Sequence, residues 1–250
     1  MKNKHDDLVS IITPVFNAAE YIDNTINSVL KQTYTNWEMI IADDCSTDNT
    51  AENVLKYDDP RIRYLKMDDN SGAARARNKA LDYAKGNFIA FLDSDDFWKE
   101  TKLEKQLSFM LDKRIGFSFT GYEILGNEKN KIIEVPSSLN YNQFMKNTII
   151  GTLTVIINRD IVGDFRIVDV KKDHDSMTWA KILRKNNIAY GLNESLAYYR
   201  KVDGSISNNK FKAAMTHWTN LRQIEKLSVF KSLYYFIFYG FNAVKKHYFS

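Results

Sequence analysis

Apolar residues in the first hundred positions follow two alternating patterns. Short apolar runs predict buried strands, and between them apolar side chains recur at helical spacing, as at Ile22, Ile26 and Val29. The predicted strands cover 8–13, 37–42, 61–66 and 88–92, and the predicted helices cover 19–32, 46–57 and 73–84. This alternation is typical of an α/β fold with a mainly parallel sheet covered by helices on both faces.

The pattern changes after Trp98, where the elements become less regular. We expect a helix at 99–113, a strand at 116–121, a polar hairpin-like stretch at 126–138, a strand at 152–158, a helix at 173–185, a short strand at 197–199, and two closing helices at 209–225 and 228–247. No internal repeat and no linker rich in Gly, Pro or Ser divides the chain. We therefore expect one domain over 1–207 with a helical C-terminal extension over 208–250.

Composition narrows the class of protein. Of the 250 residues, 44% are hydrophobic and 26% charged, as in folded proteins. The single cysteine, Cys45, cannot form an internal disulfide, which favours a reducing cytoplasm. The polar start of the chain does not resemble a signal peptide, and no run of about 20 residues lacks charge, so we expect no membrane span.

Charge is unevenly distributed along the chain. Residues 200–250 carry nine Lys and Arg but two Asp and Glu, while the first 199 residues have a net charge of −3. A nucleic-acid-binding protein usually spreads basic residues over its binding face, so we expect no nucleic-acid partner. A basic tail is instead suited to an anionic membrane surface.

Acidic and amide side chains follow several predicted strands. Asn17, Asp43–Asp44, Asp68–Gly72 and Asp93–Asp96 all come directly after a strand. The carboxyl ends of parallel strands meet at one edge of the sheet, where ligands bind in α/β folds. Such residues also occur in ordinary turns and helix caps, but the crowded carboxylates of Asp93–Asp96 favour a hard divalent cation, Mn²⁺ or Mg²⁺.

Other residues exclude some functions or give only weak evidence for a site. Pro14 follows the first strand where a glycine-rich phosphate loop would stand, which argues against classical dinucleotide or ATP binding. Arg75 and Arg77 are two positions apart on a helix, so at most one of them faces the site. His5, His217 and His247 have no zinc-site spacing and are expected at the surface or in the tail, and Cys45 is expected to pack rather than to act as a nucleophile.

Two long segments resemble a known family. VSIITPVFNAAEYIDNTINSVLKQTYTNWEMIIADDCSTDNT, followed by NSGAARARNKALDYAKGNFIAFLDSDD, is similar to family 2 glycosyltransferases of the GT-A fold. The resemblance is close over roughly residues 8–125 and weaker to about 207. It implies a nucleotide-binding half at about 8–98 and an acceptor half at about 99–207. The implied activity is inverting, metal-dependent transfer of a hexosyl or N-acetylhexosaminyl group from a UDP-sugar to a hydroxyl of a glycan, in bacterial surface-polysaccharide synthesis.

The resemblance also assigns roles to residues. It implies that Asp44 contacts the uracil base, that the backbone of Pro14–Phe16 lines the nucleoside pocket, and that Asp95 binds the metal. The residues that it implies for binding the UDP-sugar are Pro14, Phe16, Asp44, Asn70, Arg77, Asp93, Ser94 and Arg200. Arg200 belongs to a Tyr-Arg…Ser-x-Ser segment, here Tyr199-Arg200…Gly204-Ser205-Ile206-Ser207, in which a basic residue can face the diphosphate.

The catalytic base of the family lies in a Glu-Asp-x-x-x-Trp motif that opens a helix. Here the matching residues are His174, Asp175 and Trp179, so His replaces the usual Glu. The spacing to Trp179 favours Asp175 as the base, with Asp173 as the nearby alternative. Both acids could instead serve only to stabilise the N-terminus of a helix.

Two rival functions remain open. A non-catalytic sugar-nucleotide-binding or scaffold protein of a polysaccharide assembly complex would tolerate His174 in place of Glu. A sugar nucleotidyltransferase would share the sheet but needs a glycine-rich, basic loop after the first strand, and Pro14–Asn17 is not such a loop.

The aromatic tail allows two interpretations. Residues 233–241 are apolar and aromatic but too short to cross a bilayer. Lysines flank them, so 228–250 could lie in a membrane interface at the inner face of the cell membrane and bring a cytoplasmic enzyme to a lipid-linked acceptor. Alternatively, the aromatic side chains pack on the domain or form a dimer contact.

Overall fold

The computed structural model describes residues 7–126, 130–170, 172–185, 187–201 and 210–248. Its strands form one ten-stranded sheet with the order β3-β2-β1-β4-β9-β6-β10-β5, and β7 and β8 are added at β6 and β10. The strands are β1 (Val9–Val15), β2 (Trp37–Asp43), β3 (Ile62–Lys66), β4 (Phe88–Phe91), β5 (Phe97–Trp98), β6 (Phe117–Leu125), β7 (Lys131–Ile133), β8 (Ser138–Leu139), β9 (Ile156–Asn158) and β10 (Ala189–Arg200).

The first four strands confirm the predicted parallel sheet. β1 pairs in parallel with both β2 and β4, and β2 pairs in parallel with β3. β1 is buried along its whole length, as expected for a strand in the middle of a sheet with helices on both faces. Neighbouring residues such as Ile11 and Ile12 therefore point into different hydrophobic cores.

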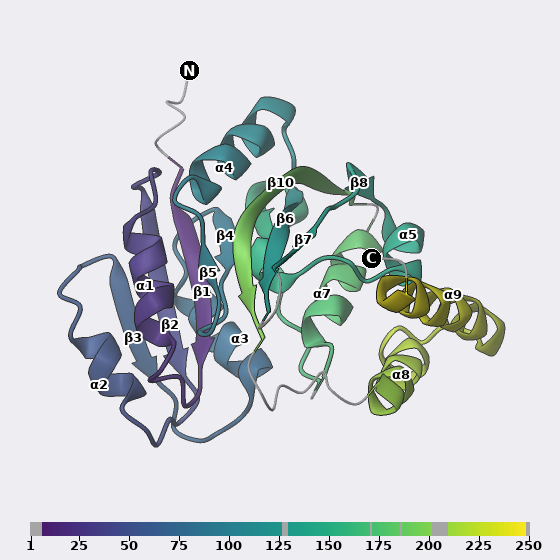
Figure 1. Ribbon diagram of the computed structural model, residues 1–250, viewed down its shortest axis with the longest axis horizontal. Helices are drawn as coiled ribbons and strands as arrows, with labels where there is room; N and C mark the ends of the chain where they lie inside the picture. The colour runs from purple at the N-terminus through teal and green to yellow at the C-terminus, as the bar shows by residue number, and fades with distance from the viewer. Residues whose placement is uncertain (1–6, 127–129, 171, 186, 202–209, 249–250) are drawn as a thin grey trace.

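Helices cover both faces of the sheet (Figure 1). Helices α1 (Ile22–Leu30) and α4 (Lys102–Lys113) pack in one core, and α3 (Ala73–Tyr83), α5 (Tyr141–Lys146) and α7 (His174–Leu183) pack in the other. The short helices α2 (Thr50–Leu55) and α6 (Arg159–Val162) complete the set before the C-terminal extension. This arrangement is the α/β architecture that the sequence predicts.

The second half departs from the sequence prediction in detail. The strand expected at 197–199 is the C-terminal end of the twelve-residue β10, whose pairing with β6 is interrupted by register shifts. The stretch expected as a strand at 152–158 begins with a 3-10 turn, η1 (Thr152–Thr154), and only then forms β9. The short α5 was not predicted, although Asn140 and Gln143 form a capping box at its start.

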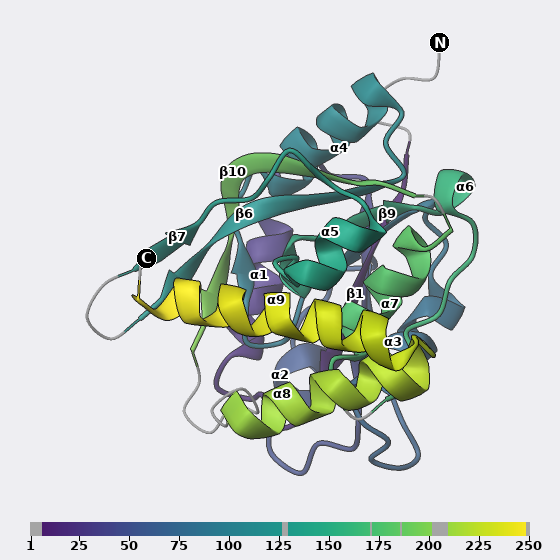
Figure 2. The same ribbon diagram turned by 90° about the vertical axis from the view of Figure 1, so that its right-hand side faces the viewer.

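The C-terminal extension packs against the rest of the chain. It consists of α8 (Lys210–Thr219), a π-helical turn η3 (Asn220–Ile224) and α9 (Val229–Tyr248). Figure 2 shows α8 and α9 side by side, and α9 packs against α5. His217, expected at the surface, is buried and stacks on Tyr239 with ring centroids 4.1 Å apart. His5 and the Ser-x-Ser segment at 204–207 lie outside the described residues.

Candidate active site

The carboxyl ends of β1 and β2 form the first wall of the site. Pro14 and Val15 are buried within β1 and pair with Ala42 and Asp43, whereas Phe16, the next residue, is 50% exposed. The following loops are tied together, because the Asn17 side chain accepts the Thr47 N–H at 2.8 Å. Of the predicted nucleoside-pocket residues, Phe16 thus offers an exposed ring, while Pro14 can contribute only backbone.

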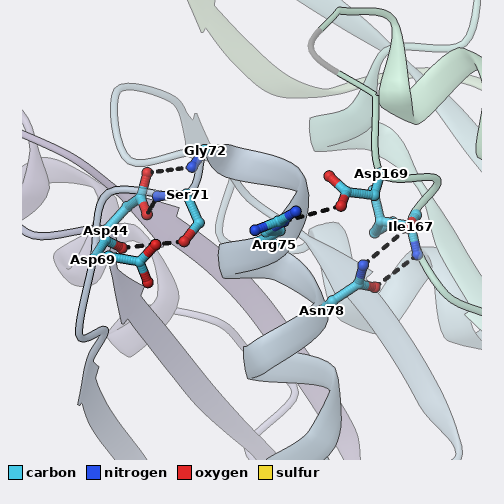
Figure 3. Close-up of polar contacts among 8 residues, drawn as sticks. All are labelled: Asp44, Asp69, Ser71, Gly72, Arg75, Asn78, Ile167 and Asp169. Atoms are coloured by element: carbon cyan, nitrogen blue, oxygen red, sulfur yellow. Dashed lines mark hydrogen bonds and ion pairs between the residues drawn. The ribbon is translucent and has the colours of Figure 1, made fainter.

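Asp44 holds the loop that leads into α3. Its two carboxylate oxygens accept the backbone N–H groups of Ser71 and Gly72, each at 2.7 Å (Figure 3). The Asn70 side chain donates to the Asp44 carbonyl at 3.1 Å. Gly72 has a φ of 91°, a conformation that glycine adopts without strain. The structure therefore brings Asp44 and Asn70 together, and each Asp44 oxygen keeps a lone pair for a further donor.

Asp43, the neighbouring acid, has a different environment. It is buried, and its carboxylate accepts the Tyr64 hydroxyl at 2.5 Å and the Ser46 N–H at 2.7 Å. Both oxygens thus bind groups of the protein that close the β2 turn. Asp43 stabilises the loop, and Asp44 is the member of the pair that lies next to the α3 loop.

Three carboxylates crowd the turn after β4. Burial and the charge of Asp93 raise the pKa of Asp95 to about 6, against the opposing influence of Arg200 and Arg77. Burial, with the charges of Asp93 and Asp95, raises the pKa of Asp96 well above its ordinary value. Ser94, between them, is half-buried, and its carbonyl accepts the Thr25 hydroxyl at 2.9 Å.

Arg200, at the end of β10, lies against this turn. Its backbone N–H donates to Asp96 at 2.9 Å, and its Nε donates to the Asp95 carbonyl at 3.1 Å. The guanidinium also lies over the Tyr21 and Phe97 rings. The structure thus places Arg200 beside the acidic turn.

The chemistry of this turn fits a divalent cation. Hard oxygen donors suit Mn²⁺ and Mg²⁺, and a cation would offset the repulsion that raises the pKa of Asp95. Asp96 Oδ2 is buried and has no hydrogen-bond partner among the described residues. The same residues contain no group of three or more His, Cys, Asp or Glu arranged as a full metal site. Water or a bound diphosphate would have to supply the other ligands.

Trp179 positions helix α7 next to the acidic turn through its packing. Its ring packs edge-on against Phe91 of β4, with centroids 5.3 Å apart. Asp93 follows Phe91 by two residues, and Asp175 precedes Trp179 by one helical turn on the same face. The Phe91–Trp179 contact therefore brings the N-terminus of α7 to the carboxyl end of β4.

Arg77, on α3, connects the turn after β4 with the N-terminus of α7. It is 4% exposed, and its guanidinium contacts the Asp93 carboxylate and His174 Nε2. A guanidinium only donates, so His174 Nε2 must accept and the imidazole is neutral. Burial, together with the charge of Arg77, lowers the pKa of His174 and maintains that state. Arg75 instead points outward to Asp169 at 2.9 Å (Figure 3), so one arginine of the pair faces the site, as predicted.

Asp175 and Asp173 have opposite environments. Burial opposes ionisation of Asp175, but the Thr152 hydroxyl, which donates to it at 2.5 Å, and the charge of Arg77 contribute to a lowered pKa. Burial and the charge of Asp175 raise the pKa of Asp173, whose carboxylate accepts from Asn220 at 3.3 Å. Asp175 is therefore an ionised carboxylate on the side of α7 near Arg77, and Asp173 lies on the side near the C-terminal extension.

Sequence reasoning missed two contributors to this site. Thr152 donates to Asp175 from the 3-10 turn, a segment that the apolar pattern assigns to a strand. Asp96 was not singled out from its acidic neighbours, although it is the most buried of them and fixes Arg200. Thr152-Leu153-Thr154-Val155 alternates polar and apolar residues as a strand does, so the local sequence carries no signal for the 3-10 turn.

No helix in the described part of the chain is long and apolar enough to cross a membrane. The fold and the acidic turn define an α/β protein with a ligand site at the carboxyl ends of its parallel strands. The sequence model described as glycosyl transferase family 2 matches residues 10–175. This chain belongs to that family, and it is a glycosyltransferase with the GT-A type of fold.

Two sequence relatives extend over nearly the whole chain. The Bacillus subtilis (strain 168) protein named "Putative teichuronic acid biosynthesis glycosyltransferase TuaG" is 50% identical over 96% of this chain and 97% of its own length. The Escherichia coli protein WfgD, named as a UDP-Glc:alpha-D-GlcNAc-diphosphoundecaprenol beta-1,3-glucosyltransferase, is 44% identical over 98% and 97%.

A solved structure supports the fold. The S. aureus TarS fragment 1–349, in complex with UDP-GlcNAc, superimposes with a TM-score of 0.69 and 22% identity. The match covers 86% of this chain and 66% of that one, so this chain spans about two thirds of the TarS fragment.

Proposed function

We propose that this glycosyltransferase moves a hexosyl or N-acetylhexosaminyl group from a UDP-sugar to a hydroxyl of a lipid-linked glycan, with inversion at the anomeric carbon, in bacterial surface-polysaccharide synthesis. One observation carries the proposal: the ionised Asp175 and the acidic turn at Asp93–Asp96 meet through Arg77. A proton acceptor would then lie near a turn whose carboxylates suit a cation. The names of WfgD and TarS, with UDP-Glc and UDP-GlcNAc, support the uridine nucleotide.

The donor would bind along the first half of the chain. Asp44 would accept the uracil N3–H with the lone pairs that Ser71 and Gly72 leave free, beside Asn70 and the backbone of Pro14–Phe16. Cytosine has no N3–H, so a carboxylate at this place favours uracil. Asp93, Ser94 and Arg77 would hold the ribose and sugar end.

Asp95 would bind Mn²⁺ or Mg²⁺ together with the diphosphate. A cation there supplies positive charge where the leaving UDP gains negative charge. Arg200, fixed to the same turn, would provide a second positive charge on the diphosphate side. Arg77 is already paired with Asp93, and its Nε has no described partner and can still donate.

Asp175 would act as the general base. Because its pKa is lowered, it is ionised at neutral pH and its hydrogen bonds to Thr152 and Ser176 fix its orientation. As the acceptor oxygen attacks the anomeric carbon from the face opposite UDP, its proton would pass to Asp175. Because Asp175 is a weak base, it can accept the proton only while the acceptor oxygen forms its bond to the anomeric carbon. The acceptor hydroxyl must therefore be held close to Asp175 and to the anomeric carbon at the same time.

The acceptor half and the membrane complete the proposal. Residues 1–207 would form the catalytic domain, with nucleotide-binding and acceptor halves at about 8–98 and 99–207, and 208–250 would form the extension. A diphosphoundecaprenol acceptor, as in the name of WfgD, is anchored in a bilayer. We therefore place the enzyme in the cytoplasm, peripheral at the inner face of the cell membrane, with 228–250 as the contacting segment.

The rival scaffold function rested on His174 in place of Glu. In the structure His174 accepts from Arg77, so the replacement keeps the contact between α7 and α3 without adding a charge. A panel of UDP-sugars, tested for thermal stabilisation and for UDP release with a GlcNAc-diphosphoryl lipid, separates the two functions. Binding together with UDP release supports the enzyme, whereas binding with no release from any donor supports the scaffold.

A further inference from the structure

Helix α9 presents a continuous apolar face away from the domain. We call it the outer face of α9, and it consists of Phe230, Leu233, Tyr234, Ile237, Phe238 and Phe241. Their spacing of three and four residues places all six on one side of the helix. They are 37% to 85% exposed, with Phe230 the highest. Isolated apolar residues are ordinary on a protein surface, but a stripe of six large ones marks an interaction site.

The opposite side of α9 is fixed to the domain. The Tyr235 hydroxyl donates to the Asn142 side chain at 2.6 Å, and the Asn242 side chain donates to the Lys146 carbonyl at 2.8 Å. Tyr239 stacks on the buried His217 of α8. The two interpretations of the tail therefore apply to different sides of one helix: one side packs on the domain, and the outer face remains uncovered.

Positive charge accompanies the outer face. Lys146 Nζ lies 5.0 Å from the centre of the Tyr234 ring and 4.8 Å from that of Phe238. Lys226 and Lys231 are exposed near the start of the helix. The sequence has no Asp or Glu after Glu225, although four lysines follow it. The surface thus combines aromatic rings with cations and lacks acidic partners on its own helix.

We infer that the outer face of α9 binds the surface of an anionic bilayer, with its aromatic and aliphatic side chains at the boundary between headgroups and acyl chains. Tyr and Phe favour that boundary, and lysines reach from it to lipid phosphates. This inference deepens the proposed function and rests on it for its purpose, since a lipid-linked acceptor is found only at such a surface. The helix lies on the bilayer and does not cross it.

A second copy of the chain fits this face less well. A twofold contact through this face would bring together two surfaces that each carry lysines, with no acidic residue on α9 to pair with them. Anionic lipid headgroups supply that missing negative charge.

The same extension reaches the active site. Asn220, in the π-helical turn before α9, donates to the Lys172 carbonyl and to the Asp173 carboxylate. Asp173 is the residue that immediately precedes α7 and Asp175. If a bilayer binds the outer face of α9, the N-terminus of α7 is therefore held at a fixed distance from the membrane surface. A lipid-linked sugar would extend from that surface towards Asp175.

The test is sedimentation of the full-length protein with vesicles. We expect binding at low salt to vesicles of phosphatidylglycerol and phosphatidylcholine, and weaker binding to phosphatidylcholine alone. The triple variant Phe230→Ser, Ile237→Ser, Phe241→Ser should reduce the bound fraction by about tenfold or more, because it removes the most exposed apolar side chains. The matched control is Leu55→Ser, Ile132→Ser, Ile161→Ser, which changes large apolar residues elsewhere that are 50% to 67% exposed and should bind as the original protein does.

Further measurements separate the possible outcomes. Lys231→Glu should also weaken binding to the anionic vesicles, without altering any apolar side chain. The inference is overturned if the unaltered protein ignores anionic vesicles, if both triple variants bind equally well, or if the outer-face variant only converts a dimer into a monomer in light scattering. Activity on a water-soluble GlcNAc-diphosphoryl acceptor tests the proposed function separately. Vesicle binding without transfer to either acceptor would refute the proposed function and leave the membrane face in place.

Discussion

Replacing Asp175 with Asn removes the proposed proton acceptor and keeps the shape of the side chain. The amide oxygen can still accept from the Thr152 hydroxyl, but its nitrogen then faces the Ser176 N–H that the carboxylate now binds. Two donors in contact cost about 1 kcal/mol of stability, so we expect the variant to fold. Loss of general base catalysis lowers turnover by about 10²-fold or more, equivalent to about 2.7 kcal/mol in the activation free energy.

The assay measures initial rates of UDP release together with calorimetric binding of the UDP-sugar. Binding of the donor should survive in Asp175→Asn, because Asp175 is not among the residues proposed to bind UDP. The matched control is Asp173→Asn, which changes the acid that faces Asn220 instead. If Asp173→Asn is inactive while Asp175→Asn retains its turnover, the base lies two residues earlier and our interpretation of α7 is wrong.

Three further predictions follow from other parts of the structure. Asp44→Ala should weaken UDP binding by about 1–3 kcal/mol, the scale of a lost buried polar contact, and equal calorimetric affinity in both proteins would exclude this role. Chelation should abolish transfer, and added Mn²⁺ should restore it in the original protein but not in Asp95→Ala. The affinity for Mn²⁺ should fall as the pH drops below about 6, because Asp95 then takes up a proton. Full activity in excess chelator would contradict metal dependence. Lys102 is fully buried, and burial lowers its pKa well below the ordinary value, so between the two pKa values the unfolded chain binds more protons than the folded chain. Stability should therefore rise with pH up to about 10.5, and Lys102→Met should raise the melting temperature more at pH 7 than at pH 10; an equal gain at both would show that the amine is charged in the fold.

The sequence predicted the first half of the fold because local patterns agree with tertiary structure there. The strands β1, β2 and β4 are short, mostly apolar and buried runs, β3 combines apolar and basic residues, and the helices between the strands carry one apolar face. Asp44, Asn70 and Asp93 could be placed at one edge for the same reason: each follows a strand of a parallel sheet. The contact of Arg77 with both Asp93 and His174 depends on the packing of α3 against α7, which no local pattern contains.

The second half was less predictable because non-local contacts override its local patterns. Within β10, Gly191, Asn193 and Glu194 break the apolar alternation, and register shifts against β6 accommodate them. The Asn193 side chain accepts the Val135 N–H at 2.9 Å, a contact that makes a polar residue useful inside a strand. His217 was assigned to the surface from its lack of metal-site spacing, and its burial arises only from the packing of α8 on α9.

The distinct environments of Asp173 and Asp175 also depend on tertiary structure. Their sequence spacing allows either to be the base, and only the contacts with Asn220 on one side and Thr152 on the other separate them. Thr152 lies on a 3-10 turn far from α7 in the chain. A prediction from sequence therefore identifies the motif, while the structure assigns an orientation to each carboxylate.

The stereochemistry of a single product tests the central claim most directly. Purified protein, Mn²⁺, a synthetic GlcNAc-diphosphoryl lipid and the α-linked UDP-sugar that gives the fastest UDP release would be incubated together, and the product would be analysed by proton NMR at its new anomeric centre. The account predicts one β-linked sugar per UDP released, formed about 10²-fold or more slowly when Asp175 is replaced with Asn. An α-linked product, or sugar transfer that is unaffected by loss of the Asp175 carboxylate, would contradict it.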